Sequence, residues 1–167
     1  MIRINVRIAD CKNDSIVDGP GLRMAIYMQG CPHNCPGCHN PQTHAPQGGK
    51  AVSIDSLINR ARANPLLDGI TITGGEPFAQ PDALKELVER FCKFLPIMVY
   101  TGYLWEDLLD NPQYRGILEH CQYLVDGPYL EAEHSHNLAF RGSANQRIID
   151  VQKSLKTGAV IRINDFD

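Results

Sequence analysis

The sequence predicts an α/β fold arranged as an open, partial (β/α) barrel of mainly parallel strands. Strand-like and helix-like segments alternate through the middle of the chain, as they do where parallel strands are joined by right-handed crossovers. The 167 residues fall well short of the ~250 that a complete eight-fold barrel requires. With 43% hydrophobic and 21% charged residues and no linker, the chain is expected to form a single domain over residues 1–167.

The amino-terminal part is predicted to contain two strands and a long loop. Apolar and polar residues alternate over residues 2–8, which is the period of a half-buried strand. A second strand is expected over residues 22–29, ending at Gly30. Proline and glycine recur through residues 30–49, so this segment is expected to be a structured loop that is ordered by something it binds.

Helix and strand alternate after this loop. Ser53 is expected to cap a helix, and Pro81 is expected to begin another. The remaining predicted elements are a helix over 114–120, strands over 69–73, 97–100 and 123–126, a loop over 127–145, and two further candidate strands over 147–151 and 159–163.

Charge and hydropathy exclude several classes of function. Sixteen basic against nineteen acidic residues give a net charge of −3, so the chain lacks the basic surface that binds nucleic acid or anionic lipid. No apolar run approaches the ~20 residues of a transmembrane helix, and the first residues do not form a signal peptide. A cytoplasmic protein without nucleic-acid or membrane partners is therefore expected.

Three of the six cysteines crowd into eight residues, as Cys31-x3-Cys35-x2-Cys38. Without a secretion signal this crowding indicates metal or redox chemistry, because soft thiolates select iron–sulfur clusters or zinc. A 4Fe–4S cluster held by three thiolates keeps one iron open to a ligand. Structural zinc is the alternative, and it needs a fourth ligand, which would be His33, His39, His44 or a distant cysteine. Cys92, near the inward face of its predicted helix, is expected to be buried.

Several segments follow predicted strands, and ligands of parallel sheets bind at the carboxyl ends of the strands. Gly74 and Gly75 allow the backbone to approach a ligand closely, and Glu76, followed by Pro77, offers an acceptor for an ammonium group. A strand-to-helix turn with a solvated glutamate is the alternative.

Two further segments are expected at the same edge of the sheet, where the parallel strands end. Asp126 ends an apolar run, where its carboxylate would accept from ribose hydroxyls or an amino group; a helix cap or turn aspartate is the alternative. Thr101 and Gly102 hold the equivalent position after another strand and would line the same pocket, with Tyr103 closing it.

The cysteine loop, followed 36 residues later by Gly74-Gly75-Glu76-Pro77, resembles the radical S-adenosylmethionine superfamily. Residues 18–23 (Asp-Gly-Pro-Gly-Leu-Arg), which lead into the strand before the loop, narrow the resemblance to the glycyl-radical activating enzymes. Within this family, the chain most resembles the enzymes that act on anaerobic ribonucleoside-triphosphate reductase. It shares with them its short length and the segments 101–103, 125–127 and 141–146. The similarity covers most of residues 10–150.

The resemblance implies a 4Fe–4S cluster on Cys31, Cys35 and Cys38, with S-adenosylmethionine chelating the open iron. It implies reductive cleavage of this cofactor and abstraction of hydrogen from a glycine Cα of the reductase, with an electron donor such as a flavodoxin. No catalytic side chain is expected beyond the cluster and the cofactor. Glu76 would hold the methionine amino group, and the cofactor pocket would comprise Gly37, Cys38, His39, Gly74, Gly75, Glu76, Pro77, Thr101, Gly102 and Asp126.

One position departs from the superfamily pattern, in which an aromatic residue that contacts adenine usually precedes the third cysteine. Gly37 stands there, so adenine is expected to contact His39 or the backbone of residues 37–39 instead. Three other functions remain open from the sequence: another glycyl-radical activase, a radical enzyme with a small substrate such as 7-carboxy-7-deazaguanine synthase, and a zinc-binding module without catalysis.

Overall fold

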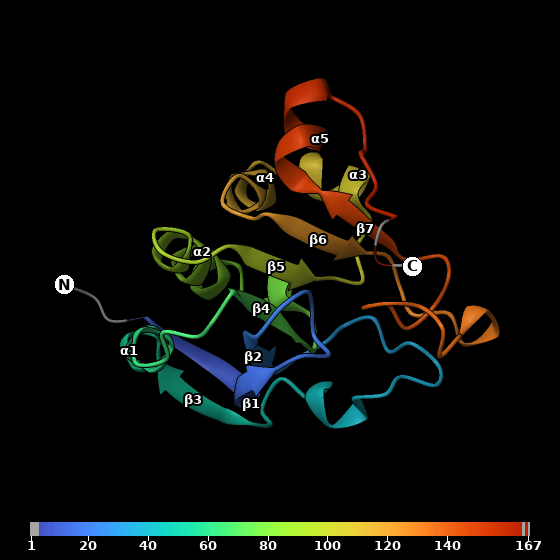
Figure 1. Cartoon of the computed structure of the whole chain (residues 1–167). Helices are drawn as coiled ribbons and strands as arrows, with labels where there is room; N and C mark the ends of the chain where they lie inside the picture. Colours follow the sequence, from blue (N-terminus) through green and yellow to red (C-terminus); the bar gives the residue numbers. More distant parts are fainter. Residues whose placement is uncertain (1–3, 165, 167) are drawn as a thin grey trace.

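The structure, a computed structural model, describes residues 4–164 and 166. Its centre is a seven-stranded sheet with the order β3-β1-β2-β4-β5-β6-β7 (Figure 1). The central strands β2, β4, β5 and β6 are parallel, whereas β1, β3 and β7 pair antiparallel at the two sides. The strands are β1 (Asn5–Ser15), β2 (Arg23–Met28), β3 (Lys50–Ser53), β4 (Gly69–Gly74), β5 (Ile97–Tyr100), β6 (Tyr123–Asp126) and β7 (Arg147–Asp150).

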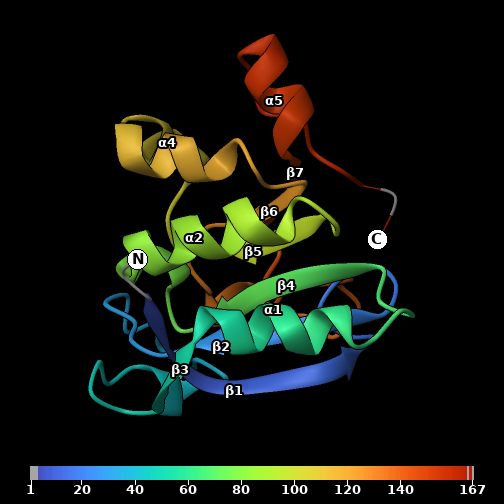
Figure 2. The same ribbon diagram turned by 90° about the vertical axis from the view of Figure 1, so that its left-hand side faces the viewer.

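The helices connect these strands. Figure 2 shows α1, α2 and α4 side by side over one face of the sheet. No helix in the described part of the chain has the length and apolar character needed to cross a membrane. The α-helices are α1 (Ile54–Arg62), α2 (Pro81–Phe91), α3 (Trp105–Leu109), α4 (Pro112–Leu118) and α5 (Val151–Thr157), and short 3-10 helices lie at Pro41–Thr43, Pro77–Ala79 and Glu131–Glu133.

Two apolar clusters lie on opposite faces of the sheet. The larger one, between sheet and helices, contains Met24, Ile26 and Met28 of β2 together with Leu84 and Leu87 of α2. Because side chains alternate along a strand, the intervening residues of the strands face the other way. The smaller cluster on that second face is formed by Met98, Val125 and Ile148, with Phe140, Ile163 and Phe166 packed against it.

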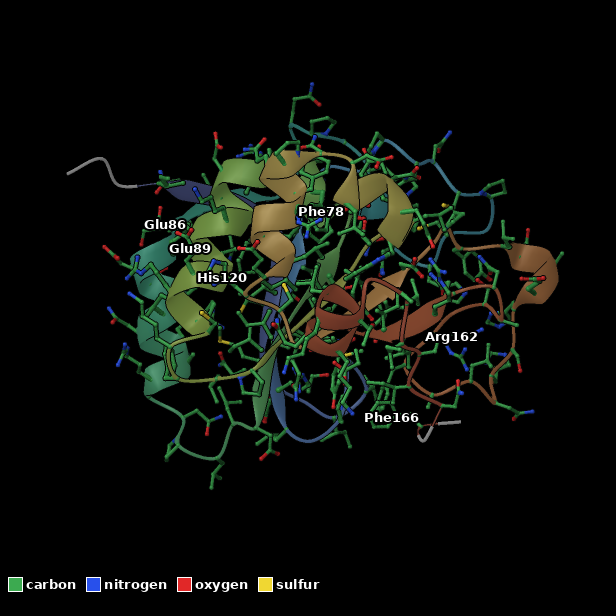
Figure 3. All side chains as sticks on the ribbon, turned by 90° about the horizontal axis from the view of Figure 1, so that it is seen from above. Phe78, Glu86, Glu89, His120, Arg162 and Phe166 are labelled. Atoms are coloured by element: carbon green, nitrogen blue, oxygen red, sulfur yellow. The ribbon has the colours of Figure 1, made fainter. Side chains whose placement is uncertain are left out.

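The segment after α5 covers part of the second face. The Ile163 amide donates to the Ile148 carbonyl at 2.8 Å. The Phe166 ring lies 5.5 Å from that of Phe140. Figure 3 shows Phe166 on the opposite side of the ribbon from Glu86 and Glu89, which α2 carries. The chain thus returns to the sheet after leaving it at β7.

A buried arginine anchors the turn between β1 and β2. Arg23 is only 2% exposed, and burial lowers the pKa of its guanidinium. Its Nε donates to Thr71 Oγ1 at 2.8 Å, and its Nη1 and Nη2 donate to the carbonyls of Pro20 and Ile70, each at 3.0 Å. Gly69 leaves room for this group, because a Cβ there would lie 2.5 Å from Arg23 Nη1. One side chain therefore ties the turn to β4.

Most of the predicted elements are confirmed. Ser53 Oγ accepts from the Ser56 amide at 3.1 Å, and Pro81 lies in the first turn of α2. The partial barrel is confirmed because β3 and β7 lie at opposite edges of the described sheet and do not pair. The start of the first predicted strand, residues 2 and 3, lies outside the described residues, and β1 continues to Ser15.

Other expectations were wrong. Residues 159–163 form no strand and contribute one isolated bridge, between Ile149 and Arg162. The sequence missed β3, α3 and α5, which span four, five and seven residues and are too short to show a clear period. Cys92 is exposed, because α2 ends at Phe91 and Cys92 is its C-cap.

We expect Arg23→Lys to lower the free energy of unfolding by about 1.5–3 kcal/mol, because an ammonium group cannot reproduce the planar set of three hydrogen bonds. Chemical denaturation of the anaerobically purified protein measures this. Exposed Arg115 provides the control, since Arg115→Lys should change the free energy of unfolding by less than about 0.5 kcal/mol. Equal stability of the two variants would contradict the anchoring role.

Candidate functional site

The cysteine loop leaves β2 at Gln29, and hydrogen bonds close its base. The Gln29 amide nitrogen Nε2 donates to the carbonyls of Gln42 and Ala45 at 3.0 and 2.7 Å. The Gly30 amide donates to the Thr43 carbonyl at 2.7 Å. These bonds hold the cysteine segment against the end of β2. Figure 1 shows this loop and the segment 127–146 on the same side of the molecule, beyond the arrowheads of β5 and β6.

The three cysteines of the loop line a single pocket. Their thiols are free and partly exposed, and burial raises the pKa of the Cys31 thiol. Within residues 4–164 and 166, no three His, Cys, Asp or Glu side chains converge as ligands of one metal ion. A 4Fe–4S cluster binds each thiolate through a different iron, so three soft thiolates around one pocket fit this group.

The Gly-Gly-Glu turn is joined to the start of the cysteine loop. The Gly75 amide donates to the Met28 carbonyl and the Glu76 amide to the Gly30 carbonyl, each at 2.8 Å. Gly74 has a φ of +93°, and a Cβ on Gly75 would overlap the Gly30 carbonyl. Only glycine allows this approach. The two motifs, 36 residues apart in sequence, therefore form one unit at the ends of β2 and β4.

The carboxylate of Glu76 is fully buried, with 0% exposure. Its Oε2 accepts from the Phe78 amide at 3.0 Å, and its Oε1 accepts from the Gly102 amide at 2.8 Å. Thr101 Oγ1 lies 2.8 Å from Oε1 and 3.0 Å from Oε2. His33 Nε2 lies 2.5 Å from Oε1. The turn, the end of β5 and the cysteine loop thus meet at one carboxylate, whose predicted contact with an amino group stays a prediction.

Tyr129 supplies the aromatic side chain beside the third cysteine. Gly37 has a φ of +76°, a left-handed backbone conformation that an aromatic residue would adopt only with strain, and a Cβ there would also displace the Glu131 carboxylate. The Tyr129 ring lies 5.0 Å from the ring of His39, with the hydroxyl 3.4 Å from His39 Nε2. Both residues line the pocket next to Cys38.

Asp126 is buried behind the pocket wall and is used for structure. Its Oδ2 accepts from the Trp105 amide at 2.9 Å, at the start of α3. Arg147 donates from Nε to Asp126 Oδ1 at 3.0 Å and also pairs with Glu106. These two carboxylates raise the pKa of Arg147, and Arg147 lowers the pKa of Glu106. The neighbouring Gly127 lines the pocket.

The pocket brings together most, but not all, of the predicted residues. The predicted residues that line it are Cys31, Cys35, Cys38, His39, Gly74, Gly75, Thr101 and Gly102. The predicted residues outside its lining are Gly37, Glu76, Pro77 and Asp126. The pocket is also lined by Gly127, Gly142 and Gln146, from the segments 125–127 and 141–146 that carry part of the resemblance. Five further lining residues were not predicted for the cofactor pocket: His33, Asn40, Thr73, Tyr100 and Tyr129.

A signal in the sequence existed for some of the missed residues. Tyr100 ends a predicted strand, and Tyr129 follows the predicted rim residue Asp126 closely. Burial raises the pKa of Tyr100, so its hydroxyl is neutral at physiological pH. Gln146 lies in the segment 141–146 that carries part of the resemblance. Whether Tyr129 and Gln146 reach the pocket depends on how the segment 127–146 packs against the cysteine loop, and hydrophobic periodicity does not predict this packing.

The fold and the pocket place a three-cysteine loop, of the kind that holds an iron–sulfur cluster, at the carboxyl ends of the strands of a partial barrel. The model of the family described as 4Fe-4S single cluster domain matches residues 17–149. This description favours a cluster over zinc for the cysteine loop.

Relatives are similar over most of the chain. The anaerobic ribonucleoside-triphosphate reductase-activating protein of Escherichia coli K12 is 36% identical over 141 residues, covering 78% of this chain and 90% of its own length. That of enterobacteria phage T4 is 30% identical over 149 residues, covering 85% and 90%. The crystal structure of QueE from Escherichia coli matches with a TM-score of 0.46 and 19% identity, over 59% of this chain and 53% of that one.

The chain belongs to the 4Fe-4S single cluster domain family and, within it, to the anaerobic ribonucleoside-triphosphate reductase-activating proteins. This membership confirms the resemblance drawn from the cysteine loop and the Gly-Gly-Glu turn.

Replacing Cys31, Cys35 or Cys38 by alanine should remove the cluster or its redox function, because three thiolates are needed to hold it. Iron and sulfide content, together with visible absorbance after anaerobic reconstitution, measure the loss. Cys92→Ala is the matched control and should retain both, since Cys92 lies outside the pocket lining. Full iron content with normal reduction in any of the three pocket variants would disprove the assignment.

Gly75→Ala should destabilise the protein by about 1–3 kcal/mol, because its Cβ would push the Gly-Gly-Glu turn away from Gly30. Thermal unfolding followed by circular dichroism tests this. Gly116→Ala is the control: a Cβ on Gly116, in α4, has no neighbour within 4 Å, and alanine is the better helix former by up to ~1 kcal/mol. Similar melting temperatures for both variants would show that the turn is not clamped.

Proposed function

We propose that this protein activates anaerobic ribonucleoside-triphosphate reductase by forming a glycyl radical on it, using a 4Fe–4S cluster and S-adenosylmethionine. The observation that carries the proposal is the single pocket in which the three-cysteine loop meets the Gly-Gly-Glu turn. Relatives that bear the name of this activity align along 90% of their length.

The chain's own residues would bind and orient these groups. When bound, the cluster and S-adenosylmethionine supply reductive cleavage of a sulfonium and abstraction of a hydrogen atom from a glycine Cα. Cys31, Cys35 and Cys38 would hold the cluster. The backbone of Gly74 and Gly75 lines the pocket beside them and would contact the methionine part of the cofactor.

The adenine would lie against the opposite wall. Tyr129 and His39 offer an aromatic surface there, and base–aromatic stacking is worth about 1–3 kcal/mol. Thr101 and Gly102 line the pocket at the end of β5 and hold Glu76, which would accept from the methionine amino group. Asp126 would act through Gly127, by fixing the rim of the pocket.

The substrate would be a protein segment. The edge strands β3 and β7 leave the described sheet open, and a chain of this size has little material to enclose a small substrate beside the cofactor. A cytoplasmic location and a one-electron donor such as a flavodoxin belong to the proposal, because the thiolates and the cluster require a reducing environment.

The reduced protein with S-adenosylmethionine should form a stable glycyl radical only when the anaerobic reductase is present. Paramagnetic resonance measures it as a doublet signal. Replacing the radical glycine of the reductase by alanine should abolish the doublet, because the splitting arises from the hydrogen that a glycyl Cα keeps after abstraction and alanine has no second Cα hydrogen. Some cofactor cleavage should continue.

Two controls make this test specific. The Cys35→Ala variant should give neither doublet nor cleavage, whereas Cys92→Ala should give both. Efficient turnover of a small molecule without any partner protein would contradict the proposal and favour a small-substrate enzyme.

A further inference from the structure

The Glu76 carboxylate already has as many donors as it can accept. A carboxylate has about four acceptor sites. The amides of Phe78 and Gly102, the hydroxyl of Thr101 and the imidazole of His33 supply four donors. Because Glu76 is 0% exposed, an incoming amino group can reach it only by replacing one of these donors.

Only one of the four donors is free to leave. The Phe78 amide belongs to the turn that Glu76 itself begins, and the Gly102 amide follows directly on β5. Thr101 is 5% exposed, and its Oγ1 also accepts from the Tyr103 amide at 3.1 Å. The His33 side chain, in contrast, is 17% exposed and lines the pocket.

His33 occupies a site shaped for its ring. The ring packs edge-on against Tyr103, with centroids 4.6 Å apart. A Cβ on Gly102 would lie 2.5 Å from the ring, so position 102 requires glycine when His33 is in place. Facing a carboxylate at 2.5 Å, Nε2 carries the proton and donates it. His33 therefore ties the cysteine loop to the turn after β4 through Glu76 and packs against the segment after β5 through Tyr103.

We propose that His33 is a displaceable positioning residue: it holds Glu76 in the cofactor-free protein and is replaced there by the α-amino group of S-adenosylmethionine, whose N–H donates to the carboxylate. This inference rests on the proposed function. It gives a role to His33, which lies between two of the cysteines but is not one of the residues to which the resemblance assigns a function. Without a ligand, the tie satisfies a buried carboxylate that would otherwise lose a strong hydrogen bond. With the ligand, the amino group takes over the same acceptor, and the cysteine loop is released from the turn after β4.

The displacement makes the pocket selective for a ligand with an amino group. A ligand without that group cannot satisfy Oε1 and so gains nothing by moving His33. Binding of S-adenosylmethionine is in turn weakened by the free energy needed to break the His33 contact. Removing the imidazole should therefore tighten binding of the amino-bearing ligand alone.

The test is equilibrium titration of oxidised, reconstituted protein under anaerobic conditions. The ligands are S-adenosylmethionine and its analogue with a 3-carboxypropyl group in place of the 3-amino-3-carboxypropyl group. His33→Ala should bind S-adenosylmethionine at least about tenfold more tightly than the wild type, since a hydrogen bond to a charged group is lost from the free state. The affinity for the analogue should not change.

Matched variants keep the result interpretable. His33→Asn, whose side chain is too short to reach Glu76, should reproduce the effect if His33→Ala fails to retain the cluster. His44→Ala is the control, because His44 lies on the same loop but lines a different cavity. It should leave both affinities unchanged. Weaker or unchanged binding of S-adenosylmethionine by the His33 variants, at full cluster content, would overturn the displacement.

A crystal structure of the wild-type holoprotein with S-adenosylmethionine needs no variant. We expect the amino nitrogen of the ligand to lie within hydrogen-bond distance of Glu76 Oε1. The distance from His33 Nε2 to Glu76 Oε1 should exceed 3.5 Å, the usual limit of a hydrogen bond. An intact His33–Glu76 contact with the ligand bound would overturn the displacement and leave the proposed function standing. Failure of the wild-type protein to bind S-adenosylmethionine at all would overturn both.

Discussion

A charge that is buried without partners is very unfavourable, and the carboxylate of Glu76 is the buried charge around which this site is assembled. Its donors come from three separate parts of the chain: the turn after β4, the end of β5 and the cysteine loop. These segments can all donate hydrogen bonds to Glu76 only if the strands that precede them, β2, β4 and β5, end side by side at one edge of the sheet. The requirement therefore fixes the geometry of the pocket.

The fold meets this requirement through parallel pairing. The strands β2, β4 and β5 are neighbours and run in the same direction, so their carboxyl ends form one edge. Gly74 and Gly75 bring the turn onto the backbone of Met28 and Gly30, close enough for two hydrogen bonds. Arg23 fixes the opposite end of β2, where its guanidinium binds the turn before it to β4. The cysteine loop thus begins from a strand that is held at both ends.

The sequence predicts those parts of the molecule whose pattern is local. The strands β4 and β5 lie between two layers of apolar contacts and read as short apolar runs, and α2 shows one buried face after Pro81. The cysteine spacing likewise indicates a metal site on its own. In contrast, α3 has five residues and depends on Asp126, which accepts from its first amide across 21 positions.

Contacts between distant residues explain what sequence reasoning missed in the site. Nothing near Gly37 indicates that Glu131 closes the space beside it or that Tyr129 lies against His39. Nor does a sequence show which cation pairs with Asp126. The contact with Arg147 holds this carboxylate behind the pocket wall. For Glu76 the residue type was informative, but its four donors depend on the fold.

The central claim is that the pocket holds a three-cysteine cluster whose open iron takes S-adenosylmethionine. The most direct measurement is electron–nuclear double resonance on the reduced protein with S-adenosylmethionine labelled with ¹⁵N at the amino group. The account predicts a hyperfine coupling between the label and the cluster electron spin, one that disappears when unlabelled cofactor is used. A cluster signal without any coupling to the bound, labelled cofactor would contradict it.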